Sequence, residues 1–239
     1  MLQFNLKNKK NMFSYYGSKS KIVDVYPPPK FDKIIEPFAG SARYALKYWQ
    51  KEVLLVDKYD VITDIWTYLI NATEKDILNL PKMVKGDNVD NFDLAKVEKQ
   101  LIGFCINGGS SQPKKTVQEY NTWETARIEI SKNVKKIKHW QIVKDDYVNL
   151  KNIEATWFID PPYMFGGEYY RHNTKHIDFN KLGEWCKSRN GQVIVCENTK
   201  ADWLPFKPMV SMQGMMYKTV EAMWSNLPTN FDNEQQSLF

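Results

Sequence analysis

Asp160-Pro161-Pro162-Tyr163 is the stretch whose residue types and order point most directly to chemistry. It follows Thr156–Ile159, an apolar run of strand-forming residues, so we expect Asp160 at the carboxyl end of a strand. The two prolines fix the backbone and remove two N–H donors, which leaves the Asp160 carboxylate and the Pro161 carbonyl as acceptors. Two acceptors suit an amine with two hydrogens to donate. The alternative is an ordinary turn after a strand.

The exocyclic amine of a nucleobase is such a donor. It is a poor nucleophile because its lone pair is conjugated into the ring. Accepting both hydrogen bonds would draw the nitrogen toward tetrahedral geometry and localise that lone pair for attack. Tyr163 could stack on the base, which must first leave the double helix to arrive there. The tetrapeptide therefore favours direct group transfer to an amine nitrogen.

A second candidate site lies nearer the N-terminus, in Ile34-Ile35-Glu36-Pro37-Phe38-Ala39-Gly40-Ser41-Ala42. It joins a strand expected over 33–36 to a helix expected over 42–49, with Gly40 and Ser41 in the turn. A glycine there lets the backbone approach a ligand closely, and the helix start offers free N–H groups. The next expected strand, 53–56, ends at Asp57, about 20 residues after Glu36, the spacing of ribose-binding acids in dinucleotide folds. Asp57 as a plain turn residue is the alternative.

A third segment is Phe13-Ser14-Tyr15-Tyr16-Gly17-Ser18-Lys19-Ser20-Lys21-Ile22. Together and in this order, the three segments resemble the signatures of Dam-type DNA adenine N6-methyltransferases, the D12 class. The resemblance covers nearly the whole chain. It implies a seven-stranded α/β methyltransferase sheet of Rossmann-like type with a small, mainly helical target-recognition insert. It further implies methyl transfer from S-adenosylmethionine to the N6 amine of adenine in DNA, with base flipping.

The resemblance also assigns residues. It gives catalytic roles to Asp160, Pro161, Pro162 and Tyr163. It places Lys19 near the methionine end of the cofactor, whereas Lys21 is expected on the surface. Tyr15 and Tyr16 stand where family members often carry Trp and a small residue, so the contacts of this segment differ from the family pattern. The full set of expected cofactor contacts is Tyr15, Tyr16, Gly17, Lys19, Glu36, Pro37, Phe38, Ala39, Gly40, Ser41, Asp57, Asp146 and Asp160.

The catalytic domain is expected to be split in two, over 1–70 and 140–226. Its second part contains strands expected over 140–143 and 192–196 and a terminal hairpin of 210–212 with 219–224. Residues 71–139 form the expected recognition insert, with helices over 92–106 and 123–138. Residues 227–239 are polar and without periodicity, which predicts a disordered tail.

DNA contacts are expected from two loops. In the polar loop 107–115, Gln112 suits reading of base edges, and Lys114 and Lys115 suit phosphate contact. After the tetrapeptide, Tyr169, Tyr170 and Arg171 lie in a glycine-flanked loop that either closes over the base or rests on the domain surface. The lysines at the end of the second insert helix either contact phosphates or form a solvated face: Lys132, Lys135, Lys136 and Lys138.

Composition sets further bounds. The chain has 239 residues with 43% hydrophobic, enough for one full core, and a net charge of +5 compatible with a polyanion partner. It shows no membrane-spanning run or signal peptide pattern, and its three cysteines lack a CxxC spacing. We therefore expect a cytoplasmic monomer without a metal. The C-terminal Gln235-Gln236-Ser237-Leu238-Phe239 resembles the peptide by which bacterial replication proteins bind the sliding clamp, a candidate partner.

Two rival functions stay open. A cytosine N4-methyltransferase would use the same two acceptors on another exocyclic amine, although Asp160 and the motif order favour adenine. A DNA-binding module of the same fold without catalysis is the second rival, and the intact tetrapeptide speaks against it. The absence of a Pro-Cys motif argues against methylation at cytosine C5.

Overall fold

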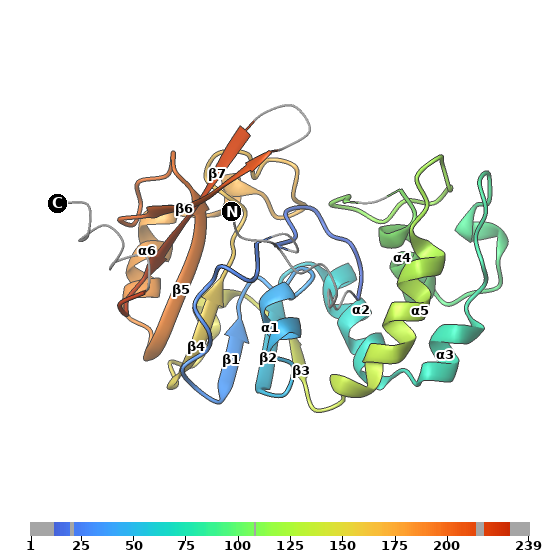
Figure 1. The fold of residues 1–239 in the computed structure, drawn as a ribbon, viewed down its shortest axis with the longest axis horizontal. Helices are drawn as coiled ribbons and strands as arrows, with labels where there is room; N and C mark the ends of the chain where they lie inside the picture. Colours follow the sequence, from blue (N-terminus) through green and yellow to red (C-terminus); the bar gives the residue numbers. More distant parts are fainter. Residues whose placement is uncertain (1–11, 20–21, 108, 214–217, 230–239) are drawn as a thin grey trace.

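The computed structural model describes residues 12–19, 22–107, 109–213 and 218–229, which build one seven-stranded sheet (Figure 1). The strands are β1 (Lys33–Glu36), β2 (Glu52–Asp57), β3 (Gln141–Lys144), β4 (Ala155–Ile159), β5 (Gly191–Asn198), β6 (Lys207–Gln213) and β7 (Lys218–Ser225). Their order is β3-β2-β1-β4-β5-β7-β6. The first five strands are parallel, and β7 is antiparallel to both β5 and β6. This is the Rossmann-like fold of S-adenosylmethionine-dependent methyltransferases, so the predicted fold class is confirmed.

The central strands are covered on both faces, which explains their apolar sequences. All five residues of β4 are buried, as are six of the eight residues of β5. Two of their buried polar side chains pair with each other, because the Thr156 hydroxyl donates to Gln192 Oε1 at 3.0 Å. Gln192 Oε1 also accepts from the Lys30 backbone N–H at 2.8 Å. This pair therefore fixes the chain that leads into β1.

Helices cover the two faces of the sheet. The helices are α1 (Arg43–Lys47), α2 (Asp60–Asn71), α3 (Glu74–Asn79), α4 (Lys96–Cys105), α5 (Trp123–Asn133) and α6 (Phe179–Lys187). Short 3-10 turns occupy η2 (Val89–Asn91), η3 (Val134–Lys136), η4 (Tyr147–Asn149) and η5 (Thr174–His176). Figure 1 shows α3, α4 and α5 together at one end of the molecule and α6 at the other. None of the helices in the described ranges is long and apolar enough to cross a bilayer.

The helices of 71–139 share their core with the sheet. Phe104 of α4 and Trp123 of α5 belong to the same buried cluster as Trp66 of α2 and Leu55 of β2. The opposite face of the sheet buries a second cluster against α6. The segment 71–139 is therefore continuous with the α2 face of the sheet and has no core that is separate from it.

Several predicted helices have the right place and the wrong ends. The helix expected over 42–49 is limited to Arg43–Lys47, because Ala42 adopts a left-handed φ of 45°. The helix expected over 92–106 begins at Lys96, where the Glu98 carboxylate accepts from the Ala95 N–H at 2.8 Å. The helix expected over 123–138 ends at Asn133 and continues as a 3-10 turn. The terminal hairpin of β6 and β7 is present as expected.

The lysines at the end of α5 lie far from the carboxyl ends of the parallel strands. Residues 132–138 lead directly into β3, so they lie at the edge of the sheet where that strand begins. The Lys138 ammonium donates to the Ile70 carbonyl at 2.8 Å and also to the Ala72 carbonyl, at the end of α2. Lys138 thus satisfies carbonyls that a helix terminus leaves unpaired.

Candidate active site

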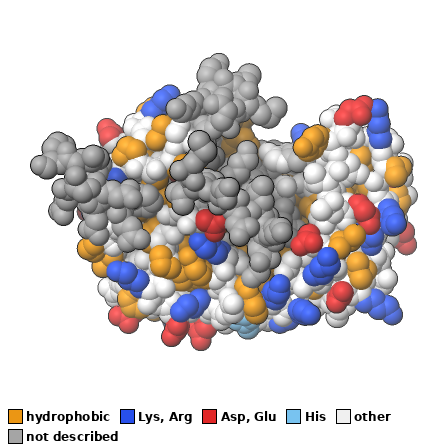
Figure 2. All heavy atoms as spheres, in the orientation of Figure 1, with side chains coloured by type: hydrophobic (Ala, Val, Ile, Leu, Met, Phe, Trp, Pro, Cys, Tyr) orange, Lys and Arg blue, Asp and Glu red, His pale blue; other side chains and the backbone are white. Residues whose placement is uncertain are grey.

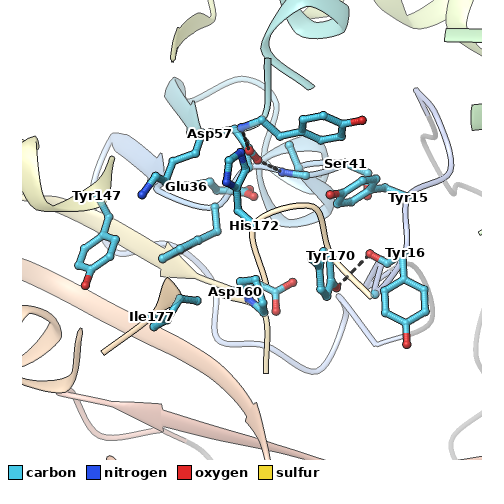
Figure 3. A pocket seen from close by; sticks show the side chains of 18 of the residues that line it. Tyr15, Tyr16, Glu36, Ser41, Asp57, Tyr147, Asp160, Tyr170, His172 and Ile177 are labelled. Carbon is cyan, nitrogen blue, oxygen red and sulfur yellow. Dashed lines mark hydrogen bonds between the residues drawn. The ribbon is translucent and has the colours of Figure 1, made fainter. Parts of the chain in front are cut away.

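A cavity of about 270 Å³ opens at the carboxyl ends of β1, β2 and β4. Glu36 ends β1, Asp57 ends β2, and Asp160 directly follows β4. Figure 3 shows these three carboxyl groups around one hollow, with Tyr15, Tyr16 and Tyr170 gathered on one side. Ligands of open α/β sheets bind at this edge because loops diverge there. The two candidate sites of the sequence are therefore one site.

Most of the expected cofactor contacts line this cavity. Those that do are Tyr15, Tyr16, Gly17, Lys19, Glu36, Phe38, Ala39, Gly40, Ser41, Asp57, Asp146 and Asp160. Pro37 is not among the lining residues. Of the tetrapeptide, Asp160 and Pro162 line it, whereas Pro161 and Tyr163 do not.

The Gly40 turn is held by hydrogen bonds from both sides. Its N–H donates to Asp57 Oδ2 at 3.0 Å, and its carbonyl accepts from the Trp66 indole N–H at 2.8 Å. Gly40 has a φ of 44°, and a Cβ atom there would lie 3.1 Å from the Tyr15 ring. Only glycine adopts this conformation without strain beside that ring.

Asp57 anchors this turn in addition to facing the cavity. Its Oδ1 accepts from the Tyr59 N–H at 2.9 Å, while Oδ2 accepts from Gly40. Burial raises the pKa of Asp57 to about 6 although these N–H groups oppose the rise. From its spacing after Glu36, Asp57 was expected to bind a ribose. The spacing did not predict that Asp57 also fixes the Gly40 turn.

Glu36 is the most deeply buried acid of the site. Its side chain is 2% exposed, and its Oε1 accepts from the Ala45 N–H at 2.6 Å. Burial raises the pKa of Glu36 to about 8, and the nearby Asp160 raises it further against the Ala45 N–H. Glu36 therefore keeps a proton at neutral pH while it fixes α1 against the sheet.

Asp160 is held by a buried ammonium group. Lys19 Nζ lies 2.7 Å from Asp160 Oδ1 and donates to the Gly17 carbonyl at 3.3 Å. Burial raises the pKa of Asp160 to about 6, although Lys19 acts in the opposite direction. The predicted cofactor segment and the predicted catalytic turn are thus joined by a direct ion pair.

Tyr163 makes contacts that the sequence did not predict. Its hydroxyl donates to Glu221 of β7, and Lys19 Nζ lies 4.6 Å from its ring centroid. The next residue, Met164, donates its N–H to Glu197 Oε2 at 2.9 Å. The carboxyl groups of β5 and β7 thus fix the chain that follows the two prolines.

Tyr170 is the aromatic residue of the following loop that lines the cavity. Its hydroxyl donates to the Tyr16 carbonyl at 3.1 Å, and the two ring centroids are 5.2 Å apart. Gly17 makes room for this contact, since a Cβ atom there would lie 1.9 Å from the Tyr170 hydroxyl. The neighbouring Tyr169 and Arg171 are exposed and do not line the cavity.

The same loop supplies lining residues that sequence reasoning missed, namely His172, His176, Ile177 and Asp178. The His172 ring packs edge-on against Tyr59 at 6.3 Å. Asp146 pairs with Lys58 at 2.7 Å, and both line the cavity. No spacing in the loop marked the histidines, because a loop has no periodicity to read.

The polar loop 107–115 lies beside the segment that contains Tyr16. The Ser110 carbonyl accepts from the Tyr16 N–H at 3.1 Å. Gln112 donates its backbone N–H to Ser110 Oγ at 3.2 Å, and Lys115 pairs with Asp90 at 2.7 Å. The Lys114 side chain is exposed, and its backbone N–H donates to the Gly103 carbonyl of α4 at 2.9 Å. The tip of this loop is thereby placed next to the cavity wall.

Comparisons with protein-family models and with curated proteins find no match. Among solved structures, the chain is similar to the "putative methyltransferase" yhhF of Escherichia coli at 8% identity, TM-score 0.36, covering 86% of this chain and 78% of that one. It is also similar to a conserved hypothetical protein of Streptococcus pyogenes, at 11% identity and a TM-score of 0.34, over 80% of this chain and 84% of that one. A third similar structure is a "putative methylase" of Haemophilus influenzae, at 10% identity and a TM-score of 0.35, over 82% of this chain and 80% of that one. Identities and scores this low carry no functional argument.

Two further expectations concern parts of the chain or groups outside this site. The clamp-binding pentapeptide Gln235–Phe239 lies outside the described residues, so it stays a prediction. Within the described ranges no group of three or more His, Cys, Asp and Glu side chains is placed to hold a metal ion.

Proposed function

We propose that this protein transfers a methyl group from S-adenosylmethionine to the N6 amine of adenine in DNA. One observation carries the proposal: Asp160 lines the same cavity as the Gly40 turn and is bound there by Lys19 of the cofactor segment. A catalytic carboxylate and a cofactor-binding turn are thus combined within a methyltransferase sheet.

The residues around the cavity fit the cofactor. Asp57 and Asp160 line the cavity with pKa values of about 6, so both are largely ionised at neutral pH and their negative charges favour a positively charged ligand. S-adenosylmethionine, when bound, supplies an electrophilic methyl group on a positively charged sulfur. The Gly40 turn offers close backbone approach, and Asp57 and Asp146 offer acceptors on the side away from Lys19.

The chain's own part in the reaction follows from the Asp160 turn. Pro161 and Pro162 have no N–H donors, so the turn presents the Asp160 carboxylate to the cavity without a competing N–H group of its own. The Asp160 carboxylate accepts a hydrogen bond from the substrate amine and orients its nitrogen toward the cofactor side. Because the ionised carboxylate is the stronger acceptor, the Asp160 pKa of about 6 predicts that transfer declines below that pH.

DNA as substrate is supported by the placement of the insert loop. The Ser110 carbonyl accepts from the N–H of Tyr16, which lines the cavity, and Gln112 donates its backbone N–H to Ser110 Oγ, so this loop lies beside the cavity wall. Figure 2 shows that, among the described residues of the visible face, Lys and Arg side chains are interspersed with Asp and Glu, and these residues form no broad basic patch there. The support comes from this local loop and from an amine chemistry that needs a flipped base.

The test is methyl transfer from labelled cofactor to double-stranded DNA, followed by separation of the methylated nucleosides. We expect N6-methyladenine, absent with Asp160→Asn and retained with the matched surface variant Asp64→Asn. N4-methylcytosine would instead identify the cytosine enzyme. Cofactor and DNA binding without transfer would identify a non-catalytic DNA-binding module and contradict the proposal.

A further inference from the structure

Glu221 lies behind the active-site turn and no motif of the sequence points to it. It belongs to β7, and its side chain is 8% exposed. Its Oε1 accepts from the Tyr26 hydroxyl at 2.7 Å and from the Tyr163 hydroxyl. The same oxygen lies 3.6 Å from Lys19 Nζ. Three side chains from distant parts of the chain thus converge on one buried carboxylate oxygen.

This convergence ties down both ends of the Asp160–Tyr163 turn. At the first end, Lys19 contacts Asp160 at 2.7 Å and Glu221 at 3.6 Å. At the other end, the Tyr163 hydroxyl donates to Glu221 directly. Tyr26, which is 2% exposed, adds a further bond to Glu221 from the segment before β1. One ammonium group is therefore shared by two carboxylates, and the carboxylate farther from Lys19 also receives the tyrosine hydroxyls.

We propose that Glu221 is a positioning residue that shares Lys19 with Asp160 and fixes the Asp160–Tyr163 turn for reaction. The role in reaction rests on the proposed function, whereas the coupling between Glu221 and Asp160 does not. Glu221 lies behind the cavity wall and is not among its lining residues, so it acts through Lys19 and Tyr163.

The negative charge of Glu221 affects the pKa of Asp160 in a known direction. The groups that face Asp160 are Lys19 from the cofactor segment, Glu36 from β1, Tyr163 and Tyr170 from its own loop, Cys196 and Glu197 from β5, Tyr26, and Glu221. Glu221 raises the pKa of Asp160, and Lys19 lowers it. Removing the negative charge of Glu221 while keeping its size should therefore lower the pKa of Asp160.

The deciding experiment is a carbon-13 NMR titration of the aspartate carboxyl groups, with the Asp160 signal assigned by its loss in Asp160→Asn. In Glu221→Gln we expect the pKa of Asp160 to fall by on the order of one pH unit, the size of a nearby like charge in a partly solvated interior. Tyr26→Phe removes a hydrogen bond to Glu221 and no carboxylate, so it should shift the pKa much less. The exposed Glu52→Gln should shift nothing. An unchanged pKa of Asp160 in a folded Glu221→Gln protein overturns the proposal.

A kinetic arm tests the positioning itself. We expect Glu221→Gln to lower kcat by about 10- to 100-fold, a cost typical of lost orientation, with the cofactor Kd changed less than twofold. The acid limb of its pH profile should move down together with the Asp160 titration. If this variant does not fold, Glu221→Asp decides, because it withdraws the carboxylate from Lys19 and keeps the charge: kcat should fall, and an unchanged kcat overturns the proposal.

The two arms separate the two proposals. If the wild-type protein transfers no methyl group but the NMR shift is present, the proposed function fails and the coupling of Glu221 to Asp160 stands. If the wild type is active and Glu221→Gln matches it in kcat and in the pKa of Asp160, the Glu221 proposal fails alone.

Discussion

The buried acid Glu36 allows the structure to be tested without a substrate. Burial raises the pKa of Glu36 from 4.5 to about 8, so the folded protein holds this proton more tightly than the unfolded chain does. Glu36→Gln replaces the buried carboxylic acid by a neutral group of the same shape, whose oxygen can still accept from the Ala45 N–H. We expect the variant to lose the part of the pH dependence of stability that Glu36 causes.

The sign follows from the raised pKa. Below pH 4.5 Glu36 is protonated in both folded and unfolded chains and costs nothing. Between pH 4.5 and about 8 the unfolded chain has lost the proton while the folded chain still holds it, so the wild type loses stability over this interval and the loss is complete above about pH 8. The interval of about 3.5 pH units corresponds to about 5 kcal/mol at most. The wild type should therefore weaken toward alkaline pH relative to the variant.

The assay is urea unfolding of both proteins at pH 5, 7 and 9, followed by circular dichroism. At pH 5 we expect the two free energies of unfolding to agree within about 1 kcal/mol, because this pH lies only about half a unit above the unfolded pKa of 4.5 and little of the loss has occurred. At pH 9 the variant should be more stable by about 3–5 kcal/mol, or roughly 10 °C in melting temperature. Asp57 and Asp160 titrate in both proteins, so the difference isolates Glu36, and Glu52→Gln is the exposed control. Parallel curves from pH 5 to pH 9 would refute the burial argument.

Three further outcomes are expected. Asp160→Asn should reduce methyl transfer by at least about 10³-fold while cofactor Kd changes less than tenfold, and near-normal turnover by a filter assay would contradict its role. Asp57→Ala frees the Gly40 N–H and removes a charged acceptor, so cofactor affinity measured by calorimetry should drop about tenfold or more; an unchanged Kd speaks against it. Replacing Lys114 and Lys115 together by Gln should weaken binding to all DNA sequences and flatten the dependence of log K on log salt, whereas an unaltered slope would mean that the loop faces away from DNA.

The elements that could be predicted well from the sequence are the strands that are buried along their whole length. β4 and β5 are apolar runs because helices cover both faces of the sheet, and such runs can be read directly. The acids at strand ends follow from the same reading, since the carboxyl ends of parallel strands must meet at one edge. Glu36, Asp57 and Asp160 each stand at such an end, which explains why the two candidate sites of the sequence form one cavity.

Helix ends were predicted less well because they depend on local capping that the apolar period does not encode. The apolar stripe of α4 extends back to Phe92, yet the helix begins at Lys96, where Glu98 satisfies the Ala95 N–H. In α1, the left-handed Ala42 delays the helix by one residue. Both helix starts are set by a single hydrogen bond or a single dihedral angle, and an apolar pattern over about ten residues does not detect either.

The support behind the active site could not be predicted, for a different reason. Glu221 and Tyr26 are 195 residues apart and carry no motif, so only the pairing of β7 with β5 shows that they meet behind Asp160. Here one buried lysine serves two carboxylates, and the energy of each ion contact depends on the other. A motif identifies the residue that contacts the substrate, whereas the electrostatic field at that residue depends on neighbours that only the fold brings close to it. The chemistry of Asp160 is therefore a property of all the chain segments that face it, and its pKa is the quantity in which their contributions can be measured.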